Sequence, residues 1–154
     1  MTARMMTPLL LVGATLALIA PCKNSFCQAQ DGDDAKKAIR KVLDDQAIAW
    51  NKGDLVGFME GYWQSPDLKF FSGKDITKGW QATLDRYRKK YQADGKKMGQ
   101  LTFTDLEIDI LGPEAALVRG RWQVAIAEEK AGGLFTLICR KLKPGWRIVH
   151  DHTS

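Results

Sequence analysis

Residues 146–154 have the sequence WRIVHDHTS and follow a Lys-Pro-Gly turn at 143–145. Aromatic and β-branched residues that alternate with polar ones are typical of a β-strand. The two histidines of the chain, His150 and His152, are two positions apart, so on a pleated strand their side chains point to the same face. We expect this strand to close the fold, because its apolar side chains need a buried surface to pack against.

Three further stretches with strand character precede it, and short turn sequences separate them: residues 100–111, 115–128 and 134–142. In the first of them the apolar positions change parity between Phe103 and Leu106, which predicts a β-bulge near residues 104–105. The EKAGG segment at 129–133 is interpreted as the turn before the third stretch. Four long consecutive strands joined by turns predict an antiparallel meander.

The N-terminal half has the periodicity of helices. Asp33 or Asp34 can cap a helix that runs to about Asn51, and Gly53 is a suitable residue to end it. The remaining expected elements are a short helix at 54–63, a strand at 68–72 and a third helix, capped by Thr77, at 77–91. Because helices and strands are segregated, we predict an α+β fold in which three helices pack in a strongly curved, mostly antiparallel sheet that forms a cone with an open mouth.

The first 29 residues differ from the rest of the chain. An almost purely apolar run at 8–20, followed by small residues just before Asp31, has the layout of a secretory signal peptide. We therefore expect residues 1–29 to be a signal peptide and residues 30–154 to form a single domain that is exported to the periplasm or secreted. The alternative is a leader that stays attached as a membrane anchor. Leader removal would leave Cys139 as the remaining cysteine, and a lone cysteine in a strand is typically a small buried hydrophobe.

The formal net charge is +5 at pH 7, and the basic residues are spread along the chain. This pattern argues against nucleic acid as a partner, and we expect no membrane contact once the leader is removed. No Gly-rich phosphate loop, nucleophile elbow or Cys-x-x-Cys pair occurs in the sequence, so no cofactor is expected. A His-x-His pair can chelate a metal, but a third ligand at suitable spacing is missing, so we predict no metal site and interpret both histidines as structural or interface residues.

Residues 115–128 leave two interpretations open. Arg119 and Arg121 share one parity, and Trp122 and Val124 share the other. In the first interpretation, the apolar parity faces the core and the arginines face solvent. In the second, the apolar parity packs against another subunit and the arginines face the interior, where a guanidinium group suits a carboxylate ligand.

The AWNKGD segment at 49–54, which follows an amphipathic helix, resembles the start of a SnoaL-like domain, and the ending at 145–154 resembles the last strand of the nuclear transport factor 2-like superfamily. The chain is especially similar to the family called domain of unknown function 4440 and to the association domain of calcium/calmodulin-dependent kinase II. This resemblance implies the cone fold, usually dimeric, with a pocket between sheet and helices. In that association domain, arginines line the pocket; Arg121 matches one such position, whereas Thr136 and Thr153 take the other two.

We expect an exported protein that binds a small molecule and forms a homodimer through its sheet. One alternative is an enzyme of the ketosteroid isomerase, polyketide cyclase or dehydratase type, acting on a small substrate that can carry a carboxylate. The other is an interaction module without a ligand. The candidate pocket residues combine aromatic, basic and polar side chains: Tyr62, Phe71, Trp80, Tyr87, Arg119, Arg121, Thr136 and His150.

Overall fold

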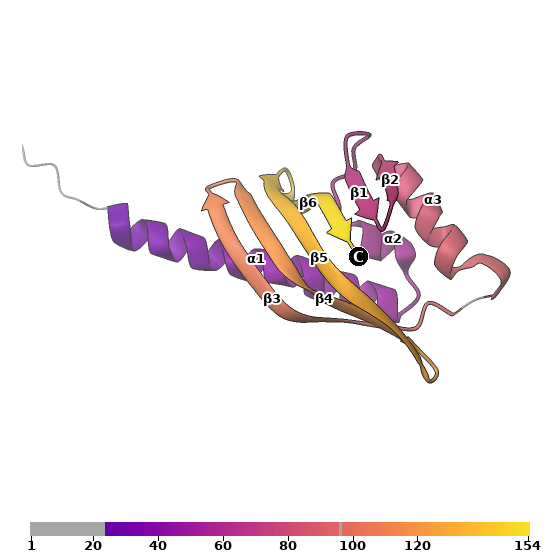
Figure 1. Ribbon diagram of the computed structural model, residues 1–154. Coiled ribbons are helices and arrows are strands. Elements are labelled where there is room, and N and C mark those ends of the chain that lie inside the picture. Colours follow the sequence, from indigo (N-terminus) through magenta and orange to yellow (C-terminus); the bar gives the residue numbers. More distant parts are fainter. Residues whose placement is uncertain (1–23, 96) are drawn as a thin grey trace, which may run out of the picture.

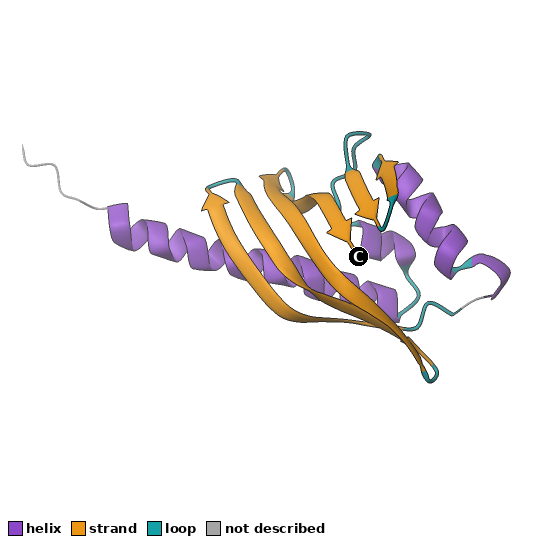
Figure 2. Ribbon diagram, in the orientation of Figure 1, coloured by secondary structure: helices purple, strands orange, loops and turns teal. Residues whose placement is uncertain are grey.

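The computed structural model describes residues 24–95 and 97–154, and the helices lie in the N-terminal half (Figure 1). The elements in chain order are α1 (Asn24–Asn51), α2 (Leu55–Met59), β1 (Lys69–Ser72), β2 (Asp75–Lys78), α3 (Trp80–Tyr91), the 3-10 helix η1 (Ala93–Gly95), β3 (Gln100–Gly112), β4 (Ala115–Ile126), β5 (Glu129–Leu142) and β6 (Gly145–Thr153). Figure 2 shows the helices and the long strands as separate layers. The predicted α+β class is confirmed.

The strands form one mixed sheet in the order β2-β1-β6-β5-β4-β3. Strands β3 to β6 pair with their chain neighbours in antiparallel fashion, which confirms the predicted meander, whereas β1 pairs with β6 in parallel. The strands bend along their length, and α1 crosses behind β3, β4 and β5 (Figure 1). The sheet therefore has an inner face that packs on the helices and an outer face turned away from them.

One face of α1 supplies much of the core. Ile39, Leu43, Gln46 and Trp50 recur at three- and four-residue spacing, and none of them is more than 2% exposed. The polar member of this face, Gln46, is satisfied, because its Nε2 donates a hydrogen bond to the Phe58 carbonyl oxygen at 3.0 Å. A buried amide without such a partner would be destabilising.

The segment after this face fixes how α1 meets its neighbours. Asn51 Nδ2 donates to the Leu101 carbonyl oxygen at 3.1 Å, and its Oδ1 accepts from the Leu101 N–H at 2.6 Å, so the side chain clamps the helix to β3. Gly53 has a φ of 75°, a conformation that favours glycine and ends the helix. Asp54 then caps α2, because its Oδ1 accepts from the Gly57 N–H at 2.8 Å.

Besides a register shift at the end of β3, two β-bulges decide which side chains of the sheet point inward. The first confirms the predicted bulge: pairing of β3 with β4 shifts by one residue between Thr104 and Glu107, and Asp105 has a φ of 52°. Before the bulge, the inward residues of β3 have odd numbers. After it, they have even numbers, beginning with Leu106.

The second bulge lies in β6 and was not predicted. Ile148 pairs with Cys139 but His150 pairs with Ile138, so Val149 is an extra residue without a partner. One extra residue exchanges the two faces of a strand. As a result, Ile148 and Asp151 both point inward, although one has an even and the other an odd residue number.

The structure corrects several predicted boundaries. Helix α1 begins at Asn24 rather than at Asp33 or Asp34, because the residues before those aspartates contain no proline and continue the same helix. Helix α2 ends at Met59, before the predicted end of that helix. Helix α3 begins one residue after Gly79, because the predicted cap at Thr77 belongs to β2, which pairs with β1.

The EKAGG segment at 129–133 forms the start of β5 and not a turn. Gly133 pairs with Trp122 of β4, and a Cβ atom at this glycine would collide with the backbone oxygen of Ser154. Glycine here therefore allows a close approach of two chain segments within the sheet. The chain reverses direction between β4 and β5 just before residue 129, where Ala127 has a φ of 53°.

The predicted signal peptide covers residues 1–29, of which residues 1–23 lie outside the described residues, so the leader stays a prediction. In the stretches 24–95 and 97–154, none of the helices has both the length and the apolar character that a membrane span requires.

Candidate functional site

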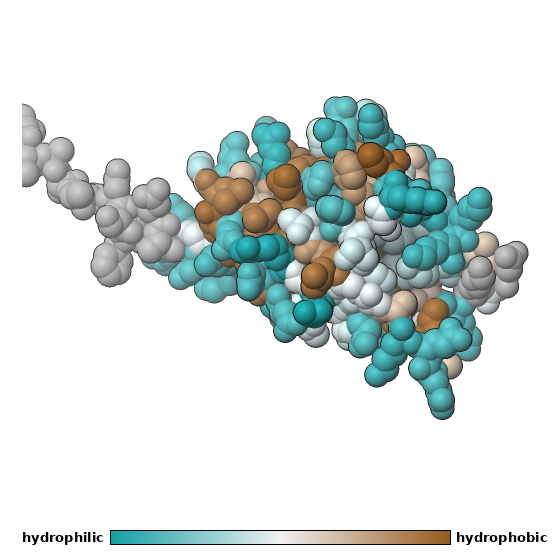
Figure 3. Space-filling model, in the orientation of Figure 1, coloured by the Kyte–Doolittle hydropathy of each residue, from teal (hydrophilic) through white to brown (hydrophobic). Residues whose placement is uncertain are grey.

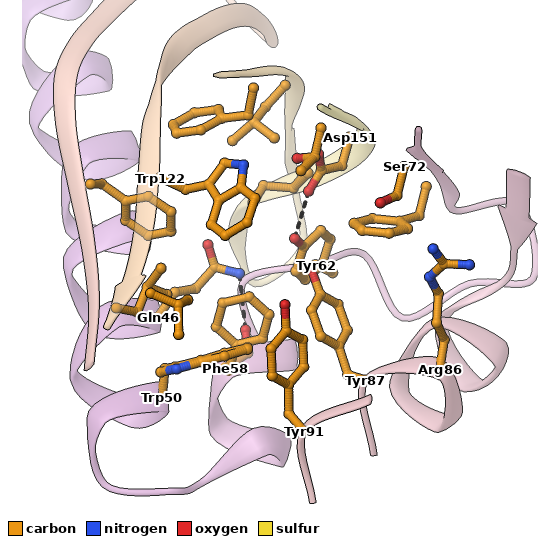
Figure 4. Close-up of a pocket in the computed structure, with 18 of the residues that line it drawn as sticks. Gln46, Trp50, Phe58, Tyr62, Ser72, Arg86, Tyr87, Tyr91, Trp122 and Asp151 are labelled. Carbon is orange, nitrogen blue, oxygen red and sulfur yellow. Dashed lines mark hydrogen bonds between the residues drawn. The ribbon is translucent and has the colours of Figure 1, made fainter. Parts of the chain in front are cut away.

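The inner face of the sheet and the helices enclose a cavity of about 300 Å³. This volume is at the lower end of the range of small-molecule sites. Its walls are mainly apolar, and nine aromatic rings contribute to them: Trp50, Phe58, Tyr62, Phe70, Tyr87, Tyr91, Phe103, Trp122 and Phe135. Figure 4 shows side chains from the helices and from the sheet converging on this common space.

The helix side of the cavity is held by contacts between rings. Trp50 meets Tyr91 and Phe58 edge-to-face, with centroid distances of 4.7 Å and 5.0 Å. Tyr87 lies 5.3 Å from Phe58 and 5.5 Å from Phe70. Edge-to-face pairs stabilise a particular mutual orientation beyond simple burial. The helix side of the cavity is therefore an ordered apolar surface.

One carboxylate, Asp151 of β6, lines this aromatic space, and it is only 4% exposed. Its Oδ2 accepts a hydrogen bond from the Tyr62 hydroxyl at 2.7 Å (Figure 4), and its Oδ1 accepts one from the Thr153 hydroxyl at 2.8 Å. Burial raises the pKa of Asp151 to about 6, even though both hydrogen bonds favour the ionised form. A carboxyl group that titrates near neutral pH in a cavity can accept hydrogen bonds and can exchange a proton.

The tyrosines beside it stay neutral. Burial, followed by the charge of Asp151, raises the pKa values of Tyr62 and Tyr87 well above the ordinary tyrosine value. Both side chains therefore keep their hydroxyl protons at physiological pH. Tyr62 can act as a permanent hydrogen-bond donor to the carboxylate.

Thiol and metal chemistry find little support in the described parts of the chain. Cys139 is buried, as predicted, and burial together with the charge of Asp151 raises its pKa to about 12. The thiol stays protonated and is a poor nucleophile. Across residues 24–95 and 97–154, no three His, Cys, Asp or Glu side chains gather into a group that could hold a metal ion.

The rim of the cavity is basic. Arg86 and Lys90 of α3 line it beside the turn between β1 and β2. Arg86 Nη1 lies 3.4 Å from Asp75 Oδ2 in a solvent-exposed ion pair. The Lys90 ammonium lies 5.0 Å from the centroid of the Tyr91 ring. Figure 4 places Arg86 at the edge of the group, apart from Asp151.

Two of the eight predicted pocket residues, Tyr62 and Tyr87, line the cavity. Trp80 does not, because its Nε1 donates to the Met59 carbonyl oxygen at 2.9 Å and ties α3 to the end of α2. The other five lie on the outer face of the sheet: Phe71, Arg119, Arg121, Thr136 and His150.

The two arginines of β4 face away from the cavity, because the alternate residues of this strand fill the core. Arg119 forms ion pairs with Asp109 and, at 3.2 Å, with Glu107, and Arg121 Nε lies 3.0 Å from Asp105 Oδ2. Of the two interpretations left open for this strand, the structure supports the solvent-facing arginines. It corrects the interpretation that placed them in the interior.

His150 lies on the outer face because of the bulge at Val149. Without the extra residue, His150 would share the inward direction of Ile148. Burial, followed by the nearby charges of His152 and Lys69, lowers the pKa of His150. Its expected place near the pocket is thus corrected to the opposite side of the sheet.

The outer face also exposes apolar residues. Leu134 and Ile138 of β5 are 52% and 39% exposed. Figure 3, which looks onto this side of the sheet, shows hydrophobic groups gathered over the strands with polar groups between them. A homodimer formed through the sheet would cover this face, and it stays a prediction.

Asp151, Arg86 and Lys90 were not identified as site residues from the sequence. Alternation along β6 places Asp151 on the opposite face from both histidines, but the unpredicted bulge decides which of the two faces is inward. Arg86 and Lys90 were counted only among the basic residues that are spread along the chain. Arg86 and Lys90 are four residues apart, and each directly precedes a tyrosine, Tyr87 or Tyr91. This spacing was the available signal that one side of α3 reaches the cavity.

Comparison with known proteins gives a consistent result. The profile of the SnoaL-like domain matches residues 39–154. A solved structure of an NTF-2 like protein of unknown function from Shewanella oneidensis MR-1 is 39% identical, covers 77% of this chain and 98% of that chain, and has a TM-score of 0.73. No curated protein matches the chain.

Two more distant structures share the fold alone. A proposed scytalone dehydratase from Novosphingobium aromaticivorans is 12% identical, with a TM-score of 0.66 and coverage of 82% of this chain and 88% of that chain. A proposed calcium/calmodulin-dependent protein kinase type II association domain from Thiobacillus denitrificans is 19% identical, with a TM-score of 0.61 and coverage of 73% and 90%. The finer similarity to domain of unknown function 4440 stays a prediction.

Proposed function

The chain belongs to the SnoaL-like domain family, with the nuclear transport factor 2-like fold, and we propose that it binds a small apolar molecule in the cavity around Asp151. The observation that carries this proposal is the cavity itself. It measures about 300 Å³, has mainly apolar walls with many aromatic rings, and contains a polar anchor where the Tyr62 hydroxyl donates to Asp151 at 2.7 Å. Apolar walls with a few fixed polar groups are the usual composition of a small-molecule site.

The size of the space supports this proposal. Protein interiors are packed about as densely as organic crystals and contain few voids larger than a water molecule. A cavity of about 300 Å³ is a large departure from that density. Water inside it would find few polar partners, so its replacement by an apolar ligand would be favourable.

The proposal can be tested with 2-naphthol as a neutral ring probe, titrated into the protein in a calorimeter. Ser72 at the end of β1 lines the cavity, whereas Lys74, two residues later in the turn to β2, does not line it. We expect saturable 1:1 binding to the wild type, at least a tenfold loss in Ser72→Trp, and no change in the matched control Lys74→Trp.

Native mass spectrometry of the purified protein gives a second readout, because it detects a retained ligand and the subunit count together. If neither 2-naphthol nor any retained small molecule is found on the folded wild type, the binding proposal fails. An interaction module without a ligand would then be the better description.

A second candidate function is catalysis of proton transfer, and the buried carboxyl group of Asp151 favours it. With a pKa of about 6, Asp151 can take a proton near neutral pH. In such a step, the carboxylate removes a proton from a carbon next to a carbonyl group, and the electron pair moves onto the carbonyl oxygen as an enolate. Return of the proton to the same or another carbon regenerates the carboxylate. The fold is shared with a proposed scytalone dehydratase.

Deuterium exchange into 2-tetralone in D₂O, followed by proton NMR, tests this second function. We expect exchange faster than in buffer alone, rising with pH through about 6 because the base must be ionised. Asp151→Asn should slow the exchange about 100-fold or more. Exchange equal to buffer in a protein that binds 2-naphthol would contradict catalysis and leave the binding function intact.

A further inference from the structure

The charged residues that line the cavity are unevenly distributed. Among the described residues, three lining side chains carry a formal charge, namely Arg86, Lys90 and Asp151. The two basic ones come from α3 and reach solvent, whereas Asp151 is 4% exposed and belongs to β6. The cavity therefore has a positive rim and a negative interior group, with aromatic walls between them.

The basic rim is available to an anion. Lys90 is exposed, and within the described residues no acidic side chain forms an ion pair with it. Arg86 contacts Asp75 at 3.4 Å, but that partner's side chain is 58% exposed, and such solvent-exposed pairs contribute little. A ligand carboxylate could replace this contact, since a guanidinium group can bind both of its oxygens at once.

The interior group is available to a hydrogen-bond donor. A carboxylate has about four lone-pair positions. Tyr62 and Thr153 each donate one hydrogen bond to Asp151, which leaves acceptor positions toward the cavity. An ammonium group would bring another charge into an apolar space, whereas a neutral hydroxyl group loses less solvation on entry.

We propose that the ligand is a planar ring acid, with a carboxylate held by Arg86 and Lys90 and a hydroxyl group that donates to Asp151. This inference rests on the proposed binding function of the cavity. The aromatic walls cover the faces of the ring system, and the two polar ends fix its direction. The hydroxyl end enters first, and the carboxylate stays at the rim, where it keeps part of its contact with water.

Three related probes separate the two ends: 6-hydroxy-2-naphthoate, 2-naphthoate and 2-naphthol. Calorimetric titration at pH 8, where Asp151 is ionised, measures the dissociation constant of each. We expect the hydroxy acid to bind about tenfold more tightly than either of the other two, because a charge-assisted hydrogen bond is commonly worth such a factor.

Two double variants of α3 provide a matched comparison, since both remove two positive charges. Arg86→Gln/Lys90→Gln changes the rim, whereas Arg88→Gln/Lys89→Gln changes neighbouring residues that do not line the cavity. The rim variant should weaken both acids about tenfold and leave 2-naphthol within about twofold, and the control should leave all three probes within about twofold.

The interior contact is tested by Asp151→Asn, with circular dichroism to verify that the variant folds. This variant should weaken the two hydroxyl-bearing probes and leave 2-naphthoate nearly unchanged. The rim variants change surface residues, so they keep the inference testable even if Asp151→Asn does not fold.

The outcomes distinguish this inference from the proposed function. If 2-naphthol binds as tightly as the hydroxy acid, or if both double variants weaken the acids equally, the ring-acid inference is overturned while the cavity remains a binding site. If none of the three probes binds, the proposed function and the inference fail together.

Discussion

On the inner face of the sheet, Asp151 is 4% exposed and burial raises its pKa to about 6. On the outer face of the same sheet, Arg119 and Arg121 have side chains that are 48% and 61% exposed and lie against carboxylates. The carboxylate of Asp151 accepts two specific hydrogen bonds in an apolar space, whereas water screens the charges of the outer arginines. Burial, more than residue type, therefore decides what a charged side chain does in this protein.

The same comparison applies to apolar residues. Leu137 and Ile138 are neighbours on β5, but Leu137 faces inward and is 3% exposed, whereas Ile138 faces outward and is 39% exposed. Substitutions on the inner face are therefore expected to lower stability more than substitutions on the outer face. Four predictions test this difference, beginning with the largest expected effect.

Leu137→Ala should lower the free energy of unfolding by about 3 kcal/mol, because it deletes a buried side chain and leaves a cavity. Ile138→Ala should cost less than about 1 kcal/mol, since its side chain already reaches solvent. Urea denaturation followed by circular dichroism measures both. Equal losses would break the comparison and indicate that the outer face is buried in an oligomer, which sedimentation of the Ile138 variant would verify.

Asp151 should make stability depend on pH. In the unfolded chain this carboxyl titrates at 3.8, and in the folded chain at about 6, so the folded state binds more protons between these values. The free energy of unfolding should therefore fall as the pH rises from about 4 to about 6, with a total change of about 3 kcal/mol. Asp151→Asn should lack this decrease.

His150 changes the stability with pH in the opposite sense to Asp151. Because its pKa is lowered, the folded state binds fewer protons near pH 6, so this residue makes the free energy of unfolding rise with pH. The difference between wild type and Asp151→Asn isolates the aspartate, since both carry His150. Parallel pH profiles of the two proteins in urea denaturation would show that the folded-state pKa of Asp151 is ordinary.

In the wild type, the hydrogen bond from Tyr62 stabilises the ionised form of Asp151. Tyr62→Phe removes this bond and should therefore raise the pKa of Asp151 above about 6. The Asp151 carboxyl carbon, followed by carbon-13 NMR across a pH titration, reports this directly. Tyr91→Phe removes a hydroxyl from the same cavity that does not bond to Asp151, and it serves as the control. A pKa that is unchanged or lowered in Tyr62→Phe would contradict the assigned donor.

Arg119→Ala on the outer face should have the smallest effect, with a loss of less than about 1 kcal/mol that shrinks further in high salt. Its partners Asp109 and Glu107 are themselves solvent-exposed, so they can be hydrated when the arginine is gone. Chemical denaturation at low and high sodium chloride measures this. A loss of several kcal/mol would mean that a further surface covers the outer face.

Much of the fold could be predicted because its signals are local. The spacing of Leu43, Gln46 and Trp50 indicates one buried helix face, and the parity change before Leu106 indicates the first bulge. The short strand β2 could not be recognised, because its four residues have no clear alternation and it is stabilised by pairing with β1. The glycines at the start of β5 indicated a turn, although Gly133 serves a close approach within the sheet.

The candidate site was predicted less well than the fold. Tyr62 and Tyr87 were placed in the pocket because aromatic residues of the helices were expected there, and they line the cavity. The arginine prediction depended on choosing a face of β4, and alternation alone leaves that choice open. The rim formed by Arg86 and Lys90 depends on how α3 is positioned against the sheet.

The sequence by itself determined the order of helices and strands, the meander, the first bulge and the family, because periodicity, capping residues and turn residues act over a few neighbouring positions. Only the tertiary structure decided which face of the sheet became the interior. The bulge at Val149 turns Asp151 inward and His150 outward, and the pairing that creates it involves residues of β5. A strand alternates by itself, but the direction of that alternation is fixed only by what packs against it.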